Sequence, residues 1–269
     1  MIIKQKIGIA IVFLCQYLLF NKYYFIIRNI KKCFQKKKEI LQKENIIIKY
    51  ENNTSLAYNK TLYHIKSTQY SRDYWEKRYK NGGNSGSGSY KHLATFKALI
   101  LNNFIKINNI STVIEWGSGD CNQLSLANYQ NYIGFDVSQT AINICKKKFK
   151  NDPSKKFFYM SENYVNDKKA DLSLSLDVIY HILEDDAFHL YMQNLFNSSN
   201  KYVCIYSSNF NKKGGAKHVK HRKFTDWINK YLAKNWKLKI YIPNKYNIHS
   251  DYNGTKSTSD FFIYEKNKF

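Results

Sequence analysis

The chain has few cysteines, and their spacing argues against a fold stabilised by disulfides or by a structural metal. The 269 residues contain five, an odd number, scattered along the sequence: Cys15, Cys33, Cys121, Cys145 and Cys204. No two of them have the spacing of a CxxC pair, and no cysteines and histidines cluster as in a zinc site. The sequence therefore predicts neither a disulfide framework nor a structural metal, and it favours a reducing compartment.

Nor does the chain contain an uninterrupted apolar run long enough to span a membrane. Residues 7–20 are mostly apolar with lysines on both sides, but they fall short of the roughly 20 residues that a span needs. Extension to Ile27 reaches that length only by including Asn21 and Lys22. We interpret this segment as a membrane anchor, with the lysine-rich stretch 31–43 keeping the rest of the chain in the cytoplasm. The alternatives are a helix on a membrane surface, a signal peptide, or a buried helix of a soluble cytoplasmic protein.

Acidic residues are scarce relative to basic ones. The sequence has 43 Lys and Arg against 20 Asp and Glu, a formal charge of +23. Residues 1–50, with 11 basic and 2 acidic side chains, contribute +9, which leaves +14 for the remainder. A basic surface attracts phosphorylated small molecules, anionic lipid or RNA without choosing among them. Proline is rare and Lys, Asn, Ile and Tyr are abundant, so an AT-rich genome explains part of this charge.

From residue 90 onward, apolar stretches of strand length alternate with longer segments of helical periodicity. This alternation is typical of βαβ units and a parallel sheet. It predicts strands at 111–115, 132–136, 156–160, 171–176 and 202–207, and helices at 91–107, 122–128, 138–150 and 183–197. A further helix at 224–234 precedes two strands, 238–242 and 261–264. Only a loop separates these strands, so we expect them to pair antiparallel.

A glycine turn follows the first of these strands. Residues 112–120 read Thr-Val-Ile-Glu-Trp-Gly-Ser-Gly-Asp, and glycines in such a turn let the backbone bend sharply and approach a ligand closely. The next strand ends at Asp136, 19 residues beyond Gly117, the separation at which a carboxylate reaches ribose hydroxyls. A dinucleotide-binding fold requires a third glycine where Asn122 stands, so it is the weaker interpretation.

These residues, with three neighbouring motifs, resemble the class I S-adenosylmethionine-dependent methyltransferases. The motifs are Tyr74-Trp75-x-x-Arg78-Tyr79 with the Gly/Ser stretch 82–89, Gly134–Ser138, and Leu174–His181. The resemblance implies a Rossmann-like α/β fold with a mostly parallel seven-stranded sheet, a C-terminal antiparallel hairpin and an added N-terminal apolar helix. It divides the chain into the apolar helix (1–30), a basic spacer and linker (31–69) and a methyltransferase domain (70–269). Where the family often has another glycine, this sequence has Cys121.

The resemblance also implies where the cofactor S-adenosylmethionine binds. Glu115 would organise the turn, while Gly117 and Gly119 would line the methionine part. Asp136 would hold the ribose. Asp177, at the end of the fourth strand, would face the methionine side; the alternative is that it caps the following helix. The complete set of implied cofactor-binding residues is Trp75, Glu115, Gly117, Ser118, Gly119, Asp120, Asp136, Val137 and Asp177.

One histidine is placed to act as a base. Methyl transfer is an in-line displacement, for which a protein positions the acceptor and removes a proton. His181 follows the fourth strand, whose loop lies beside the methyl group in this fold, and a neutral imidazole accepts a proton near pH 7. His181 is therefore the candidate catalytic residue, with a structural histidine at the rim as the alternative.

A strongly basic segment follows the fifth strand. Eight of the twelve residues from Lys212 to Lys223 are Lys, Arg or His. Loops at the carboxyl ends of parallel strands form the ligand crevice of such sheets, so we expect His218, His221 and Arg222 to bind an anionic substrate. The alternative is a solvated loop. No third ligand accompanies the two histidines, so we predict no metal.

The sequence therefore predicts a membrane-tethered methyltransferase that acts on an anionic small molecule. A hydroxyl or phosphorylated group of a sugar or another glycan precursor is the acceptor that we favour. The alternatives are an RNA or protein methyltransferase that uses the basic surface, and a catalytically silent interaction module. The Asn-Pro-Pro-Tyr signature of many adenine methyltransferases is absent after the fourth strand, where Asp177–Tyr180 stands, so nucleic acid is the less favoured partner.

Overall fold

The computed structural model describes residues 69–160, 168–213 and 215–267. The apolar segment 7–27 and residues 31–68 of the spacer and linker lie outside these residues, so the membrane anchor stays a prediction. Within the described ranges, no helix is both long enough and apolar enough to cross a lipid bilayer.

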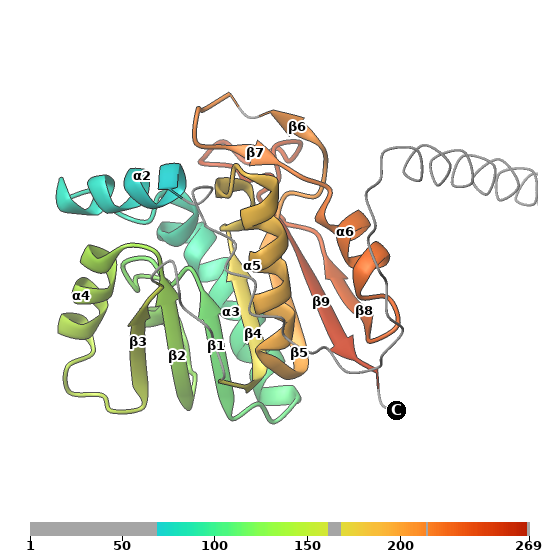
Figure 1. Cartoon of the computed structure of the whole chain (residues 1–269), viewed down its shortest axis with the longest axis horizontal. Helices are drawn as coiled ribbons and strands as arrows, with labels where there is room; N and C mark the ends of the chain where they lie inside the picture. Colours follow the sequence, from blue (N-terminus) through green and yellow to red (C-terminus); the bar gives the residue numbers. More distant parts are fainter. Residues whose placement is uncertain (1–68, 161–167, 214, 268–269) are drawn as a thin grey trace, which may run out of the picture. The chain divides into compact units, whose positions relative to one another are not determined.

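A seven-stranded sheet forms the centre of the described residues (Figure 1). Its strand order is β3-β2-β1-β4-β5-β9-β8. Strands β1 to β5 run parallel, and β9 runs antiparallel to both neighbours, β5 and β8. The strands are β1 (Thr112–Trp116), β2 (Asn131–Asp136), β3 (Lys155–Tyr159), β4 (Ala170–Leu176), β5 (Ser199–Ser207), β8 (Trp236–Ile242) and β9 (Asp260–Lys266). The predicted α/β class, with its parallel sheet and antiparallel C-terminal hairpin, is confirmed.

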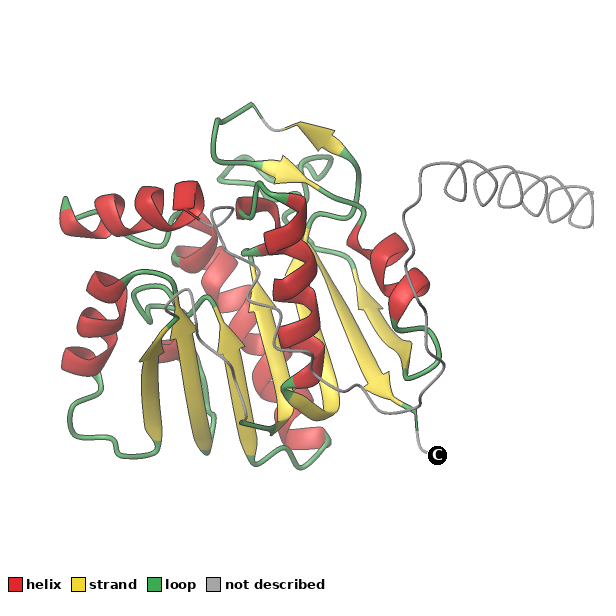
Figure 2. Ribbon diagram, viewed as in Figure 1, coloured by secondary structure: helices red, strands yellow, loops and turns green. Residues whose placement is uncertain are grey.

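Helices cover both faces of the sheet, and α5 crosses one face while α3 crosses the other (Figure 2). On one side, Leu101 and Phe104 of α3 share a core cluster with Leu172 of β4. On the other side, Met192 of α5 packs with Val203 of β5. Because both faces are covered, the central strands are almost continuously buried, which is why they read as apolar runs. The α-helices are α2 (Gln69–Lys80), α3 (Lys91–Ile107), α4 (Gln139–Lys148), α5 (Asp185–Asn197) and α6 (Phe224–Tyr231).

The carboxyl ends of the parallel strands meet at one edge of the sheet. Helix α2 and the small hairpin of β6 (Lys212–Lys213) and β7 (Lys220–His221) lie beyond that edge (Figure 1). The fold therefore brings the start of the described chain and the basic segment 212–223 to the edge where ligands bind in open α/β sheets.

One predicted helix does not form. In place of a helix over 122–128, the structure has a single 3₁₀ turn, η2 (Leu124–Leu126). Polar side chains here bond to the backbone of neighbouring segments. The amide of Asn122 donates to the carbonyl of Ser89, and the hydroxyl of Ser125 donates to that of Cys121. Such local bonds compete with a regular helix.

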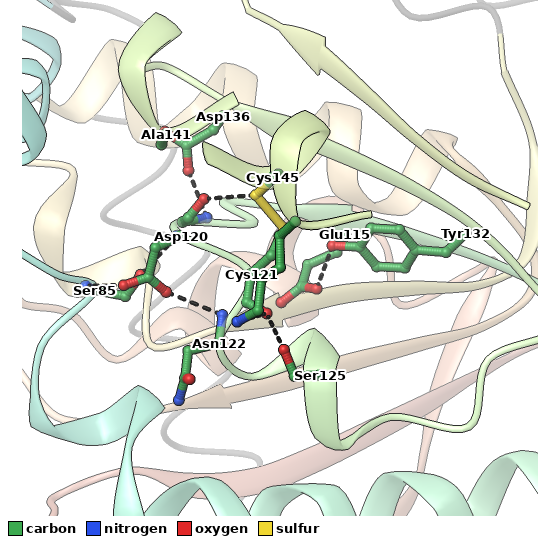
Figure 3. The surroundings of a disulfide bond; sticks show 12 residues. Ser85, Glu115, Asp120, Cys121, Asn122, Ser125, Tyr132, Asp136, Ala141 and Cys145 are labelled. Atoms are coloured by element: carbon green, nitrogen blue, oxygen red, sulfur yellow. Dashed lines mark hydrogen bonds between the residues drawn. A yellow bond between two sulfur atoms is a disulfide. The ribbon is translucent and has the colours of Figure 1, made fainter. Parts of the chain in front are cut away.

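The prediction that the cysteines form no disulfide is wrong. Cys121 and Cys145 are bonded, with their Cα atoms 5.5 Å apart (Figure 3). Cys121 ends the glycine turn and Cys145 lies on α4, so the bond joins two segments 24 residues apart in the sequence. Spacing alone did not reveal this pair, because the packing of α4 against the turn creates it. Cys204 is a buried free thiol.

Candidate functional site

A pocket lies at the carboxyl ends of β1, β2 and β4, and we call it the central pocket. Its wall contains every residue predicted to bind the cofactor, together with the predicted base: Trp75, Glu115, Gly117, Ser118, Gly119, Asp120, Asp136, Val137, Asp177 and His181. These residues come from helix α2, the turn after β1, the end of β2 and the segment after β4. The fold therefore brings together side chains that are up to 106 positions apart in the sequence.

The glycine turn after β1 is shaped by its neighbours. Gly117 has a positive φ of 92°, and Gly119 one of 56°, a region that disfavours residues with a Cβ. A Cβ on Gly117 would stand 2.5 Å from a methyl carbon of Val178. The amides of Gly117 and Ser118 both donate to the carbonyl of Phe135, at 2.8 and 2.9 Å. The turn is thus held against β2 with its glycines facing the pocket.

Asp136, at the end of β2, is a buried carboxylate held by backbone amides. It accepts hydrogen bonds from the amides of Gly119 at 2.9 Å and Ser138 at 2.8 Å. Burial raises its pKa to about 6, and these hydrogen bonds only partly oppose the rise. Nearby, Tyr132 donates to Glu115 at 2.6 Å, and burial raises the pKa of Glu115 to about 7 (Figure 3).

Asp120 anchors the Gly/Ser stretch 82–89, which we call the strap. Its carboxylate accepts from the amide of Ser85 at 2.9 Å and the hydroxyl of Tyr90 at 2.7 Å. In return, the Asp120 amide donates to the Ser85 hydroxyl at 2.9 Å. Burial opposes ionisation of Asp120, yet these bonds lower its pKa. The strap therefore lies against the glycine turn, and Gly88 passes so close to Asp177 that a Cβ there would stand 2.6 Å from its carboxylate.

Asp177 sits in a left-handed backbone conformation, with φ 60°, directly after β4. Its carboxylate accepts from the ammonium of Lys97 at 2.9 Å, the hydroxyl of Tyr180 at 3.0 Å and the hydroxyl of Ser259 at 2.8 Å. The alternative in which Asp177 caps the next helix fails, because Glu184 is the N-cap of α5.

His181 lines the central pocket and lies among several aromatic rings. Its Nδ1 lies 3.1 Å from the carbonyl oxygen of His218, which can only accept, so Nδ1 carries the proton. Its ring stacks on that of His218, with centroids 5.3 Å apart, and Trp75 meets it edge-on at 5.0 Å. Burial lowers the pKa of His181 to about 4, against the opposing hydrogen bond to His218. The ring is therefore neutral at pH 7, with Nε2 as a proton acceptor.

No protein-family model matches the sequence, and no curated protein matches it either. Solved structures do match the fold. Magnesium protoporphyrin IX methyltransferase from Synechocystis, determined with bound S-adenosyl-L-homocysteine, has a TM-score of 0.54 and 13% identity, covering 74% of this chain and 100% of that one. The N-methyltransferase NodS from Bradyrhizobium japonicum, in complex with the same molecule, has a TM-score of 0.51 and 10% identity, covering 73% and 98%. The methyltransferase domain of bacterial CtHen1 has a TM-score of 0.50 and 19% identity, covering 64% and 97%.

The chain has the class I methyltransferase fold. At these identities the likeness establishes the arrangement of the sheet and helices, which agrees with the strand order found here. The central pocket lies at the carboxyl edge of the parallel strands, which is where open α/β sheets bind their ligands.

The three residues predicted to bind the substrate, His218, His221 and Arg222, do not lie together in the structure. The ring of His218 stacks on that of Tyr74, with centroids 4.2 Å apart, and on that of His181, which lines the central pocket. His221 instead lies 2.7 Å from the hydroxyl of Ser208 and packs on Phe210. Arg222 is largely buried and donates to Asp185 at 2.9 Å, to the carbonyl of Leu183 at 2.6 Å and to that of Ile182. These bonds hold residues 182–185, which lead into α5, in place.

His221 and Arg222 line a second pocket, formed largely by the segment 211–223, which we call the basic pocket. Five cationic side chains line it, Lys212, Lys217, Lys220, Arg222 and Lys223, against two carboxylates, Asp185 and Asp226. Asp185 pairs with Lys220 and Arg222, and Asp226 pairs with Lys223. The pocket therefore keeps a net positive charge. Among the described residues, no group of three His, Cys, Asp or Glu side chains forms a metal site.

Sequence reasoning missed two residues that organise the site. Glu76 of α2 accepts from the hydroxyl of Ser138 at 2.6 Å and from the amide of Thr140 at 3.1 Å, at the start of α4. Burial opposes its ionisation, but these bonds lower its pKa to about 2. The other residue is Lys97, whose buried ammonium pairs with Asp177. A lysine within an apolar helical stretch was the available sign of the second; the sequence carried no comparable sign of the first.

Proposed function

We propose that this protein transfers a methyl group from S-adenosylmethionine to an anionic small-molecule acceptor. The observation that carries the proposal is the convergence of ten predicted residues, from Trp75 to His181, on one pocket. Two structures with this fold were determined with S-adenosyl-L-homocysteine bound, and this molecule is the demethylated form of the cofactor.

The residues of the central pocket suit this cofactor. The carboxylate of Asp136 has acceptor capacity beyond its two backbone amides, as the recognition of ribose hydroxyls requires. The buried hydroxyl of Ser118 has no hydrogen-bond partner within the described residues, so it is available to a ligand. Side chains at Gly117 and Gly119 would crowd their neighbours. When bound, the cofactor supplies a methyl group that its sulfonium activates.

His181 is the residue that we propose to remove the proton of the acceptor. The bond from Nδ1 to the His218 carbonyl fixes the tautomer and leaves the Nε2 lone pair for an acceptor hydroxyl. Stacking on His218 and the edge contact with Trp75 hold the ring in one orientation. Burial keeps the His181 ring neutral at pH 7, so that its Nε2 can accept a proton.

The hairpin supports the choice of an anionic acceptor. It carries His218, whose ring stacks on His181 of the central pocket, and within a few positions in the sequence it also carries residues that line the basic pocket. Lys212 and Lys217 line the basic pocket, and neither has an ion-pair partner among the described residues. A phosphorylated sugar or another phosphorylated glycan precursor would extend from His181 towards these lysines.

The test is a transfer assay with the full chain and methyl-labelled S-adenosylmethionine, offered the small molecules, RNA and protein of a cell extract separately. We expect label in the small-molecule fraction, in a product retained by an anion exchanger. Label in RNA, with binding that weakens steeply with salt, would contradict the acceptor class, as would label in protein. Cofactor binding without transfer to any fraction would identify a silent module.

A further inference from the structure

Glu76 is a carboxylate of one helix that bonds to the start of another. It lies on α2, and its Oε2 accepts from the hydroxyl of Ser138 at 2.6 Å and the amide of Thr140 at 3.1 Å. Its Oε1 accepts from the hydroxyl of Thr140 at 2.8 Å. The ion pair with Lys80, at 3.2 Å, adds little, because 65% of the Lys80 side chain is exposed. Ser138 and Thr140 are therefore the partners that hold the carboxylate of Glu76 in place.

These bonds satisfy the amino end of α4. The first four amides of a helix have no partner within the helix. Glu76 accepts from the amide of Thr140, and the hydroxyl of Ser138, which donates its proton to Glu76, accepts from the amide of Ala141 at 3.1 Å. The first turn of α4, residues 139–142, has no acidic side chain. Since negative charge stabilises this end of a helix, α2 supplies the charge that α4 lacks.

The same segment orients the carboxylate that we expect to hold the ribose. The amide of Ser138 donates to Oδ1 of Asp136 at 2.8 Å, and the amide of Gly119 donates to Oδ2 at 2.9 Å. One of the two amides that orient Asp136 thus belongs to the residue whose side chain Glu76 holds. Hydrogen bonds weaken steeply as they bend, so a rotation of Ser138 would misdirect Asp136. Glu76 itself is not part of the wall of the central pocket, so it acts through Ser138 and not on the ligand.

We propose that Glu76 is a positioning residue for the cofactor, which orients Asp136 towards the ribose hydroxyls through Ser138. This assignment rests on the proposed function, because it presumes that S-adenosylmethionine occupies the central pocket. It also gives α2 a role in both halves of the site. Trp75, the neighbour of Glu76 on this helix, packs edge-on against His181, so one helix orients both the ribose carboxylate and the proposed base.

Calorimetry with two ligands tests the assignment on the full chain. The ligands are S-adenosyl-L-homocysteine and its 2′,3′-dideoxy analogue, which lacks both ribose hydroxyls. The unaltered protein should prefer S-adenosyl-L-homocysteine by roughly 5- to 150-fold, the worth of two hydroxyl hydrogen bonds. Glu76→Ala should reduce this preference by roughly 2- to 12-fold, the worth of one such bond. A residue that only joined the two helices would change the affinities for both ligands by the same factor.

Three further variants separate positioning from folding. Ser138→Ala removes the hydroxyl that Glu76 holds and should reduce the preference in the same way. Combining it with Glu76→Ala should reduce the preference no further, because both changes break one chain of contacts. Glu76→Gln keeps an oxygen that can accept from Ser138 and should retain most of the preference. Lys80→Gln is the matched control: it removes the exposed partner of Glu76 and should bind both ligands normally.

The outcomes are distinct. An unchanged preference in Glu76→Ala, whether both affinities fall equally or neither falls, would overturn the assignment. So would equal affinity of the unaltered protein for the two ligands, since no hydroxyl bond would then be there to lose. If the unaltered protein binds neither ligand, the proposed function itself has failed, and the assignment fails with it.

Discussion

His181 provides the sharpest mechanistic prediction, because its surroundings fix both its tautomer and its charge. Replacing it by Ala or Gln removes Nε2 as the proton acceptor while leaving Gly117, Asp136 and Asp177 in place. A placed general base is worth about 10²–10⁴-fold in rate. A base with a pKa near 4 is weaker than one matched to pH 7, so we expect a loss towards the lower end of that range. Cofactor affinity should stay close to that of the unaltered protein.

The pH dependence of turnover is the more specific readout. An unperturbed histidine would give an acid limb near pH 6.5, which is what the sequence alone suggests. Burial moves the expected limb to a pKa of about 4, because only below that value is the ring protonated in the folded state. The stability of the fold should depend on the same protonation. Between pH 6.5 and 4, His181 is protonated in the unfolded chain but stays neutral in the folded protein, so the free energy of unfolding falls as the pH falls.

The assay is steady-state transfer to the identified acceptor, measured across this pH range. His249→Ala is the control, since His249 is exposed and lies on a loop outside both pockets. A normal rate in His181→Ala, or an acid limb in the unaltered protein that the substitution leaves in place, would refute the role of His181.

Three other predictions follow from the strap, the disulfide and the N-terminal segment. Asp120→Ala should speed amide exchange in residues 85–90 and weaken cofactor binding, since it removes the acceptor for Ser85 and Tyr90; unchanged exchange would contradict the anchoring role. Cofactor should slow exchange in the strap of the unaltered chain. Reduction of the disulfide, or Cys145→Ser, should lower the free energy of unfolding by about 3 kcal/mol, because the bond closes a loop of about 24 residues; coincident denaturation curves with and without reductant would count against it. Deletion of residues 1–50 should release the protein from membranes and leave cofactor binding intact; a truncated protein that still sediments with membranes would exclude the anchor.

Features that depend on a short stretch of chain could be predicted from the sequence. The glycine turn, the strand ending in Asp136 and the alternation of strands and helices each lie within about thirty residues, and their residue types are those that the geometry needs. The mostly parallel seven-stranded sheet with its antiparallel C-terminal hairpin followed from the resemblance. These local patterns, with the resemblance that they carry, identified ten of the residues that line the central pocket.

Features created by packing between distant segments could not be predicted in this way. The pair of Lys97 and Asp177 joins residues 80 positions apart, and Glu76 reaches α4 across more than 60. The Cys121–Cys145 bond depends on how α4 lies against the turn. Arg222 illustrates the same limit. Its charge suggested that it binds the substrate, whereas in the structure it is largely buried and forms an ion pair with Asp185.

The central claim, that the pocket holds S-adenosylmethionine, is tested most directly by calorimetry with S-adenosyl-L-homocysteine. We expect one binding site per chain. Asp136→Ala should weaken binding by roughly 5- to 150-fold, because two ribose hydroxyl bonds of about 0.5–1.5 kcal/mol each are lost. Asp251→Ala, an exposed aspartate outside the pocket, should bind normally. No binding to the unaltered protein, or equal affinity in the Asp136 variant, would contradict the account.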